Sequence, residues 1–178
     1  MFTKNFTTFC NDYLLTNWYS SQRTLNFIDY EGNSVSYTPS SSSYAYILAN
    51  YFNQIGNDEV NSTCPANSGK LFIKCGLNNT EETYNDYTLN SIISSSSLAY
   101  ISSSMGNGAT GKVFYTTFQN ISNEDIIINE IGLFFKFNSD YVNNSTSFCG
   151  LFYRETIPGA ITVKPNEIVT IPIDLFFI

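Results

Sequence analysis

The densest set of possible metal ligands in the chain lies between residues 76 and 86. Its three carboxylates and three amides are Glu81, Glu82, Asp86, Asn78, Asn79 and Asn85. Oxygen ligands of these two kinds bind Ca²⁺ in protein loops. The spacing is not that of an EF-hand, and no glycine stands in the middle of the set. We therefore predict a solvated acidic loop, with a calcium site as the alternative.

A single carboxylate, Glu130, lies within the apolar stretch Ile126–Phe137. Burying a carboxylate without a partner is costly. Arg154 or Lys136 is the partner that we expect, and the prediction is a structural ion pair at the end of a strand. Because no second catalytic group lies near Glu130 in the sequence, a catalytic acid is the less favoured interpretation.

The common forms of hydrolytic catalysis lack their parts. The chain has no histidine, which removes Ser–His and Cys–His pairs and the most frequent zinc ligand. Glu124 and Asp125 are adjacent, and we predict turn residues there and not an acid–base pair. We expect no enzyme, no catalytic residue, no metal and no cofactor.

The four cysteines, Cys10, Cys64, Cys75 and Cys149, are widely spaced and form no CxxC motif. This spacing indicates neither a zinc knuckle nor a redox pair. Buried thiols that behave as small hydrophobic side chains are the favoured interpretation. A disulfide such as Cys64–Cys75 is the alternative.

The formal net charge is −7, and the eight basic residues are scattered between Lys4 and Lys164. Nucleic-acid binding requires Lys and Arg gathered on one surface, so we expect no nucleic-acid partner. The first residues lack the uninterrupted apolar core and the cleavage site of a signal peptide, and no apolar run is long enough to span a bilayer. We expect neither secretion by a signal peptide nor a membrane partner.

Aromatic residues make up 16% of the chain and charged residues only 13%. Aromatic and β-branched residues suit a half-buried pleated sheet, so this composition favours a β-rich protein. A surface rich in Tyr, Asn and Ser is also typical of binding surfaces. Trp18 and the tyrosines are candidates for stacking on sugars, and aromatic residues of the core are the alternative interpretation.

The segment Gly111–Phe137, around which we expect the chain to be organised, predicts a β-hairpin. In its first arm Phe114, Thr116 and Phe118 alternate with Val113, Tyr115 and Thr117, the period of a pleated strand. The second arm places one face on Ile127, Ile131, Leu133, Phe135 and Phe137. Since Ile126, Ile128, Glu130, Phe134 and Lys136 lie on the opposite face, we expect both faces to be covered.

Further strands are expected on both sides of this hairpin. They lie at residues 24–30, 34–38, 70–75, 87–93, 98–103, 148–155, 160–163 and 167–178. The first two flank a glycine turn and predict a second hairpin. Pro172 predicts an edge or a bulge in the last strand. Apolar residues at helical spacing predict a helix at 44–55 and a short helix or arm at 6–18.

These elements predict an all-β fold, an antiparallel β-sandwich of jelly-roll or immunoglobulin-like type with a small α-containing N-terminal segment. Residues 1–60 are expected to form a docking segment with a hairpin and one amphipathic helix. Residues 69–178 are expected to form the sandwich domain. The polar, turn-rich residues between the two parts mark the boundary.

Several short motifs follow one another in the order seen in small virion proteins of tailed bacteriophages. The first contains Asp86, Tyr87 and Leu89, the second is Glu130-Ile131-Gly132-Leu133, and the third contains Arg154, Pro158, Val163 and Glu167. Over residues 69–178 the chain therefore resembles this group. Cys75-Gly76-Leu77 and Asn166 stand where the group has glycine-rich turns.

The resemblance implies a non-enzymatic structural component of a virion, as a head fibre or decoration protein or as part of the neck or tail. Its partners would be capsid, neck or tail subunits and further copies of itself, because such proteins work as symmetric oligomers or on a symmetric lattice. The location would be the virion, assembled in the host cytoplasm. The alternative function is a carbohydrate-binding or adhesive β-sandwich that recognises a glycan on the host surface.

Overall fold

A computed structural model describes residues 1–8, 25–37, 70–107, 111–137 and 148–176. In these ranges the helix is α1 (Lys4–Thr8). The strands are β1 (Leu25–Ile28), β2 (Ser34–Tyr37), β3 (Lys70–Gly76), β4 (Leu98–Asn107), β5 (Gly111–Asn120), β6 (Ile126–Phe137), β7 (Phe148–Val163) and β8 (Ile168–Phe176). The predicted helix at 44–55 and most of the one at 6–18 lie outside the described residues, and so does Trp18.

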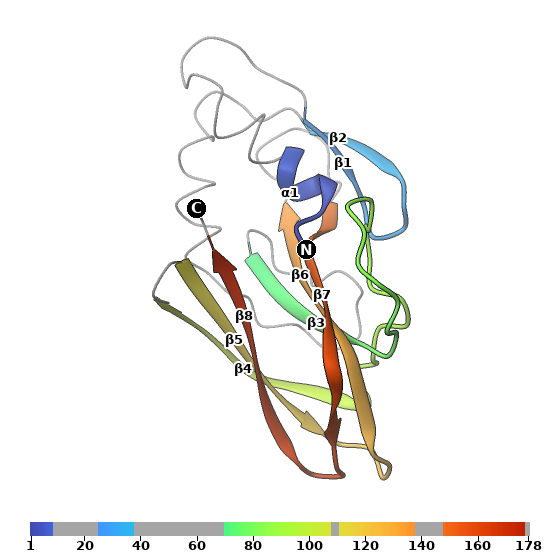
Figure 1. The fold of residues 1–178 in the computed structure, drawn as a ribbon, viewed down its shortest axis with the longest axis vertical. Coiled ribbons are helices and arrows are strands. Elements are labelled where there is room, and N and C mark those ends of the chain that lie inside the picture. The colour runs from blue at the N-terminus through green and yellow to red at the C-terminus, as the bar shows by residue number, and fades with distance from the viewer. Residues whose placement is uncertain (9–24, 38–69, 108–110, 138–147, 177–178) are drawn as a thin grey trace.

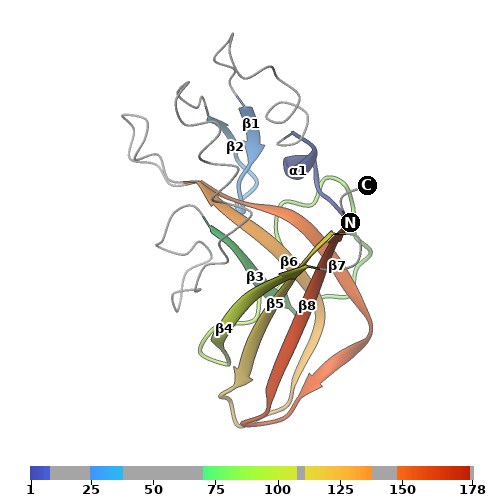
Figure 2. The ribbon, with the colours of Figure 1, turned by 90° about the vertical axis from the view of Figure 1, so that its left-hand side faces the viewer.

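The strands form three antiparallel sheets, which confirms the predicted all-β class. Two sheets have three strands each, in the orders β3-β6-β7 and β4-β5-β8, and the third is the hairpin β1-β2. Figures 1 and 2 show the two larger sheets facing each other, with α1 and the hairpin at one end. The hairpin turns at Gly32, whose φ of 89° is a left-handed conformation that favours glycine. Two strands predicted around a glycine are thereby confirmed.

One apolar core lies between the two larger sheets. On β5, Phe114 and Phe118 are buried, while the intervening Tyr115 is exposed, so the predicted alternation of that strand is confirmed. The other strands add a set of buried side chains that includes Leu71, Ile73, Ile131, Leu133, Phe135, Ile171 and Ile173. Removing this apolar surface from water is the main driving force for the fold.

The predicted pairing of the two arms of Gly111–Phe137 was wrong. The first arm, β5, pairs with β4 and β8, and the second arm, β6, pairs with β3 and β7. The connection therefore crosses from one sheet to the other. Buried Asn120 holds this crossing, because its side-chain amide donates to the carbonyls of Glu124 at 2.8 Å and Val163 at 2.7 Å. Turn residues alone do not distinguish a hairpin from such a crossing.

The alternation along β6 changes phase in the middle of the strand. Ile126 and Ile128 are buried in the same core as Ile131, whereas Ile127 is 49% exposed. The predicted grouping of Ile127 with Ile131 was therefore wrong. The pairing with β7 is irregular between Ile128 and Glu130, and a bulge of this kind turns the following side chains to the other face.

The second face of β6 is also covered, as predicted for a strand that is apolar on both sides. Phe134 stacks on Phe72 with ring centroids 5.5 Å apart. Leu89, Leu151 and Cys149 complete this second, smaller cluster of buried residues. Leu89 belongs to the segment between β3 and β4, so that segment closes over the outer side of the β3-β6-β7 sheet.

Residues 87–93 do not form the predicted strand. Ile92 makes a single bridge to Gly76, and Ser91 has a φ of 63°. A left-handed residue interrupts an extended strand, which explains the difference. The two strands predicted at 148–155 and 160–163 are in turn one continuous strand, β7. Its pairing with β6 is irregular between Thr156 and Ile161, where Gly159 and Ala160 have positive φ.

The first residues extend the β3-β6-β7 sheet along the edge of β7. The backbone N–H of Thr3 donates to the carbonyl of Phe152 and the N–H of Arg154 to the carbonyl of Met1, each at 3.0 Å. Phe2 bridges to Tyr153 between these two bonds. The edge of β7 is thus paired along this part of its length.

The hairpin β1-β2 also joins the common core. Asn5 of α1 is buried and exchanges hydrogen bonds with the backbone of Ile28, at 2.7 Å to its carbonyl and 2.8 Å from its N–H. Phe27 is completely buried, with its ring centroid 5.5 Å from that of Phe135. The described residues before position 38 therefore share a core with residues 70–176. The division into a docking segment, 1–60, and a sandwich, 69–178, stays a prediction.

We expect Phe27→Ala to lower the free energy of unfolding by about 3 to 5 kcal/mol, because it leaves a cavity in the shared core. Urea denaturation of the full chain measures this loss. Ile168→Ala is the control, since Ile168 is 57% exposed and a surface truncation of that kind changes stability by about 0.5 kcal/mol or less. Equal effects of the two substitutions would show that β1 is not part of the core.

Candidate functional site

The predicted acidic loop is held against the sheet by one buried arginine. Arg154 of β7 donates from Nε to Glu130 of β6 and from Nη1 to Asp86 of the loop, both at 2.7 Å. Its Nη2 donates to the carbonyl and the hydroxyl of Thr80 at 3.0 and 3.1 Å. The side chain is buried, so these bonds replace the water that the guanidinium loses. Of the two partners predicted for Glu130, the structure assigns Arg154.

Two of the three loop carboxylates, those of Glu82 and Asp86, form hydrogen bonds within the fold. Asp86 accepts from Arg154 and from the N–H and hydroxyl of Thr83. Glu82 accepts from the N–H and hydroxyl of Thr156 on β7, at 2.6 and 2.8 Å. The calcium alternative needs these oxygens to converge on an ion, and they point to separate partners instead. Among the residues that the structure describes, no three His, Cys, Asp or Glu side chains are grouped to hold a metal ion.

The pKa values of the three carboxylates Glu130, Asp86 and Glu82 are shifted in different directions. Burial raises the pKa of Glu130, and the nearby Arg154 offsets only part of that effect. Burial also acts to raise the pKa of Asp86, but hydrogen bonds from Thr83 and Arg154 outweigh it and lower the pKa. The pKa of Glu82 is lowered in the same way by its bonds from Thr156, against the effect of burial.

The side chain of Glu130 packs closely against the backbone at Gly76. Its Oε2 bonds to Arg154, whereas its buried Oε1 has no hydrogen bond of ordinary geometry. The N–H groups of Asn78 and Asn90 lie near enough to favour the charged form. Gly76 lies directly against this side chain, and a Cβ atom at that position would come within 2.3 Å of Oε1. Position 76 therefore has no space for a side chain.

Glu124 and Asp125 lie in the connection between β5 and β6, as predicted for turn residues. Both are exposed. They border a groove of about 490 Å³ whose other wall includes Leu77 and Ile92. No local sequence pattern predicts this groove, because its walls come from segments that lie far apart in the chain.

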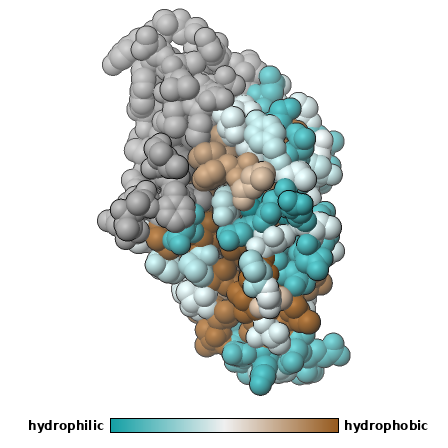
Figure 3. All heavy atoms as spheres, viewed as in Figure 1, coloured by the Kyte–Doolittle hydropathy of each residue, from teal (hydrophilic) through white to brown (hydrophobic). Residues whose placement is uncertain are grey.

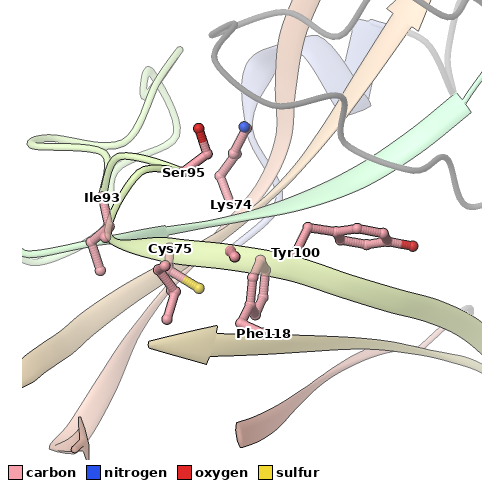
Figure 4. Close-up of a pocket in the computed structure, with 8 residues that line it drawn as sticks. Lys74, Cys75, Ile93, Ser95, Tyr100 and Phe118 are labelled. Carbon is pink, nitrogen blue, oxygen red and sulfur yellow. The ribbon is translucent and has the colours of Figure 1, made fainter. Parts of the chain in front are cut away.

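A second, smaller cavity lies at the edge between β3 and β4. It has a volume of about 50 Å³, which leaves room for a few water molecules. Figure 4 shows the thiol of Cys75 pointing toward Phe118, with Lys74 and Ser95 on the other side. Burial raises the pKa of this thiol, so it stays protonated and is a poor nucleophile.

Cys75 and Cys149 are buried thiols and not halves of a disulfide. The favoured interpretation of the cysteines is confirmed for these two, and the alternative pairing of Cys64 with Cys75 was wrong. Cys10 and Cys64 lie outside the described residues. Cys75 belongs to the main core and Cys149 to the smaller cluster, where each acts as a small apolar side chain.

The solvent-facing side of the β4-β5-β8 sheet, which we call the outer face, carries small hydroxyl and aromatic side chains. Its two central rows across the sheet are Ser102, Thr117 and Thr170, and Ser104, Tyr115 and Pro172. The hydroxyls of Thr117 and Thr170 are 2.9 Å apart and bond to each other. Within these rows there is no charged side chain. Asp174 lies at one end, opposite Val113.

The edges of the two larger sheets are poorly suited to accept a further strand. Residues Met1–Thr3 pair with β7, and the N–H of Ile93 donates to the carbonyl of Cys75 at the end of β3. The edge strand β8 contains Pro172, which confirms the predicted edge position, and β4 has a bulge at Ile101. Proline and bulges both hinder edge-to-edge pairing. Contacts with other proteins are therefore expected through faces.

We expect opposite pH dependences from Glu130 and Asp86. Because the pKa of Glu130 is raised in the folded state, stability is lost as the pH rises from about 4.5 through that raised value. Because the pKa of Asp86 is lowered, stability is lost as the pH falls below about 3.8. Urea denaturation across this range should show that Glu130→Gln removes the first slope and Asp86→Asn reduces the second. A first slope that persists in Glu130→Gln would contradict this assignment.

We expect Gly76→Ala to destabilise the fold by about 1 to 3 kcal/mol, because the new methyl group overlaps Glu130. Thermal and urea denaturation measure the change. Gly106→Ala is the matched control, since a Cβ there meets Tyr115 at an ordinary 3.4 Å. If Gly76→Ala were as stable as this control, the close packing of Glu130 on the backbone would be wrong.

No helix in the described part of the chain is long and apolar enough to cross a membrane. Comparisons with protein-family models, with curated proteins and with solved structures find no match to this chain. The resemblance to small phage virion proteins therefore rests on the order of the sequence motifs.

Proposed function

We propose that this chain is a non-enzymatic structural component of a tailed-bacteriophage virion, which contacts a neighbouring subunit through the outer face of β4-β5-β8. The observation that carries the proposal is the absence of charge from the two central rows of that face in a protein with a net charge of −7. Protein interfaces are depleted of charged residues at their centre and enriched in tyrosine. The head, the neck and the tail are the candidate locations.

The outer face has further properties of a contact surface. Tyr115 is 38% exposed at its centre, and Ile101 and Ile168 are exposed on the neighbouring strands. The hydroxyls of Thr117 and Thr170 bond to each other, so one of their two O–H donors keeps its partner when a neighbouring subunit displaces water. The backbone of the outer face is fixed by the pairing of its three strands, which reduces the conformational entropy lost on association.

The sheet order supports the finer fold that the proposal requires. β3 pairs with β6 and β5 pairs with β8, and in each case the two intervening strands lie in the other sheet. Connections of this Greek-key type are the usual ones in β-sandwiches. We therefore include in the proposal an antiparallel β-sandwich, of the jelly-roll or immunoglobulin-like class.

Carbohydrate binding by the same surface is the second candidate. An exposed tyrosine beside rows of hydroxyl groups is suited to stacking on a sugar ring and to hydrogen bonds with its hydroxyls. Tyr84 and Tyr87 are also exposed, at 45% and 40%. In this case the protein would be the adhesive module of a particle, or a free binding module.

Tyr115→Asp tests the contact, because it places a charge at the centre of the outer face. Light scattering of the purified full chain and imaging of particles from the source should show a defined oligomer, or a symmetric position on a virion, for the unmodified protein. We expect Tyr115→Asp to dissociate the oligomer or to abolish incorporation. Tyr84→Asp, at a tyrosine of similar exposure away from the outer face, should have neither effect.

Circular dichroism establishes that each variant is folded, and Ser104→Glu in the same row serves as a second variant of the face. A monomer at high concentration that is absent from particles would overturn the virion proposal. Glycan binding that is lost in Tyr115→Ala would favour the second candidate. Assembly that both charged variants leave unchanged would show that another surface makes the contact.

A further inference from the structure

A groove opens at the end of the molecule where β5 passes into β6, the lower end in Figure 1. Its volume of about 490 Å³ lies within the usual range of binding pockets. Its aliphatic side chains are Leu77, Ile92, Ile93, Ile126 and Ile127. Leu77 and Ile127 are each 49% exposed, although most aliphatic side chains of this size are buried in a folded protein. Figure 3 shows apolar residues exposed over the lower half of this view, beside hydrophilic residues at the lower end.

The walls of the groove are fixed by hydrogen bonds to the rest of the fold. The N–H of Leu77 donates to the carbonyl of Ser91, and the side-chain amide of Asn129 donates to the carbonyl of Leu77 at 2.6 Å. On the other wall the single O–H of Ser122 lies between two acceptors, Oδ1 of Asn120 at 2.7 Å and the carbonyl of Glu124 at 2.9 Å. A groove with fixed walls loses little conformational entropy when a ligand binds.

The border of the groove is negatively charged. Glu124 and Asp125 line it, both are exposed, and their carboxylates form no ion pair with any residue that the structure describes. Ser94, Ser97 and Ser122 add hydroxyl groups along the same border. An aliphatic floor with an acidic border is complementary to a ligand that carries aliphatic groups next to positive charges.

We propose that this groove binds a peptide segment of another protein in which Ile, Leu or Val side chains stand next to Lys or Arg. The aliphatic side chains would lie on Leu77, Ile92 and Ile127, and the basic ones would reach Glu124 and Asp125. This contact is separate from the outer face, so the inference does not depend on the proposed function of that face.

The lining residues argue against other classes of ligand. None of the described residues that line the groove is aromatic, and sugar rings are usually bound by stacking on aromatic side chains. The acidic border repels phosphates and nucleic acids. A second copy of this chain would bring another net charge of −7, which opposes its approach to the same border.

Three short peptides test the proposal on the full chain by fluorescence anisotropy. The labelled probe is acetyl-Lys-Ile-Lys-Leu-Lys-amide, and the comparison peptides replace either all Lys by Glu or both aliphatic residues by Ser. We expect saturable binding of the probe alone. Ile127→Ser and Glu124→Lys should each weaken this binding by about tenfold or more.

Two matched variants control for effects outside the groove. Ile168→Ser truncates an isoleucine that is also exposed but lies on β8, and Glu31→Lys reverses an exposed charge in the β1-β2 turn. Both should bind the probe like the unmodified chain. If the probe were attracted only by the overall negative charge of the protein, Glu31→Lys would weaken its binding as much as Glu124→Lys. That result would overturn the proposal.

Three further results would contradict the proposed ligand. Binding of the Glu peptide with equal affinity, or no binding of any peptide, would refute a groove for basic aliphatic segments. An oligomer in light scattering that Ile127→Ser dissociates would show that a second copy occupies the groove. These results do not bear on Tyr115→Asp, so failure of this inference and failure of the proposed function can be told apart.

Discussion

The ion pairs of the buried Arg154 guanidinium with Glu130 and Asp86 are the interactions on which the rest of this structure depends. Arg154 joins three parts of the chain, since it bonds to Glu130 within the sheet and to Asp86 and Thr80 in the segment between β3 and β4, while its own backbone pairs with Met1. A buried charge of this kind is tolerated only when every polar neighbour is placed correctly. The segment before β4 is thereby held over the outer side of the β3-β6-β7 sheet, where Leu89 covers Phe134 and Phe72.

This arrangement decides which surfaces are left for other molecules. With one side of the β3-β6-β7 sheet covered and the edges paired, bulged or interrupted by proline, the broad surface left among the described elements is the outer face of β4-β5-β8. That face is uncharged in its centre, whereas the end of the molecule carries a groove with an acidic border. The two surfaces differ in chemistry, one suited to a flat neighbouring subunit and the other to a narrow basic segment.

Much of the fold was predictable because its signals are local. The alternation of side chains identified β5, and the glycine turn identified the β1-β2 hairpin. The partner of Glu130 was narrowed to two cations because a buried carboxylate requires one. The pairing of β5 with β6 and the strand at 87–93 were wrong, because a turn sequence is compatible with a hairpin or a crossing, and because a left-handed residue such as Ser91 leaves no clear trace in the sequence.

The sequence by itself determined the all-β class, the buried thiol character of Cys75 and the need for an ion pair at Glu130, since each follows from residue type and short-range period. Only the tertiary structure decided which strands share a sheet, that Asp86 bonds to Arg154, and that Leu77, Ile92 and Ile127 line one groove with Glu124. The physical reason is that strand partners and surface grooves are formed by residues far apart in the chain. Their approach depends on the sum of all core contacts, and no local pattern carries that sum.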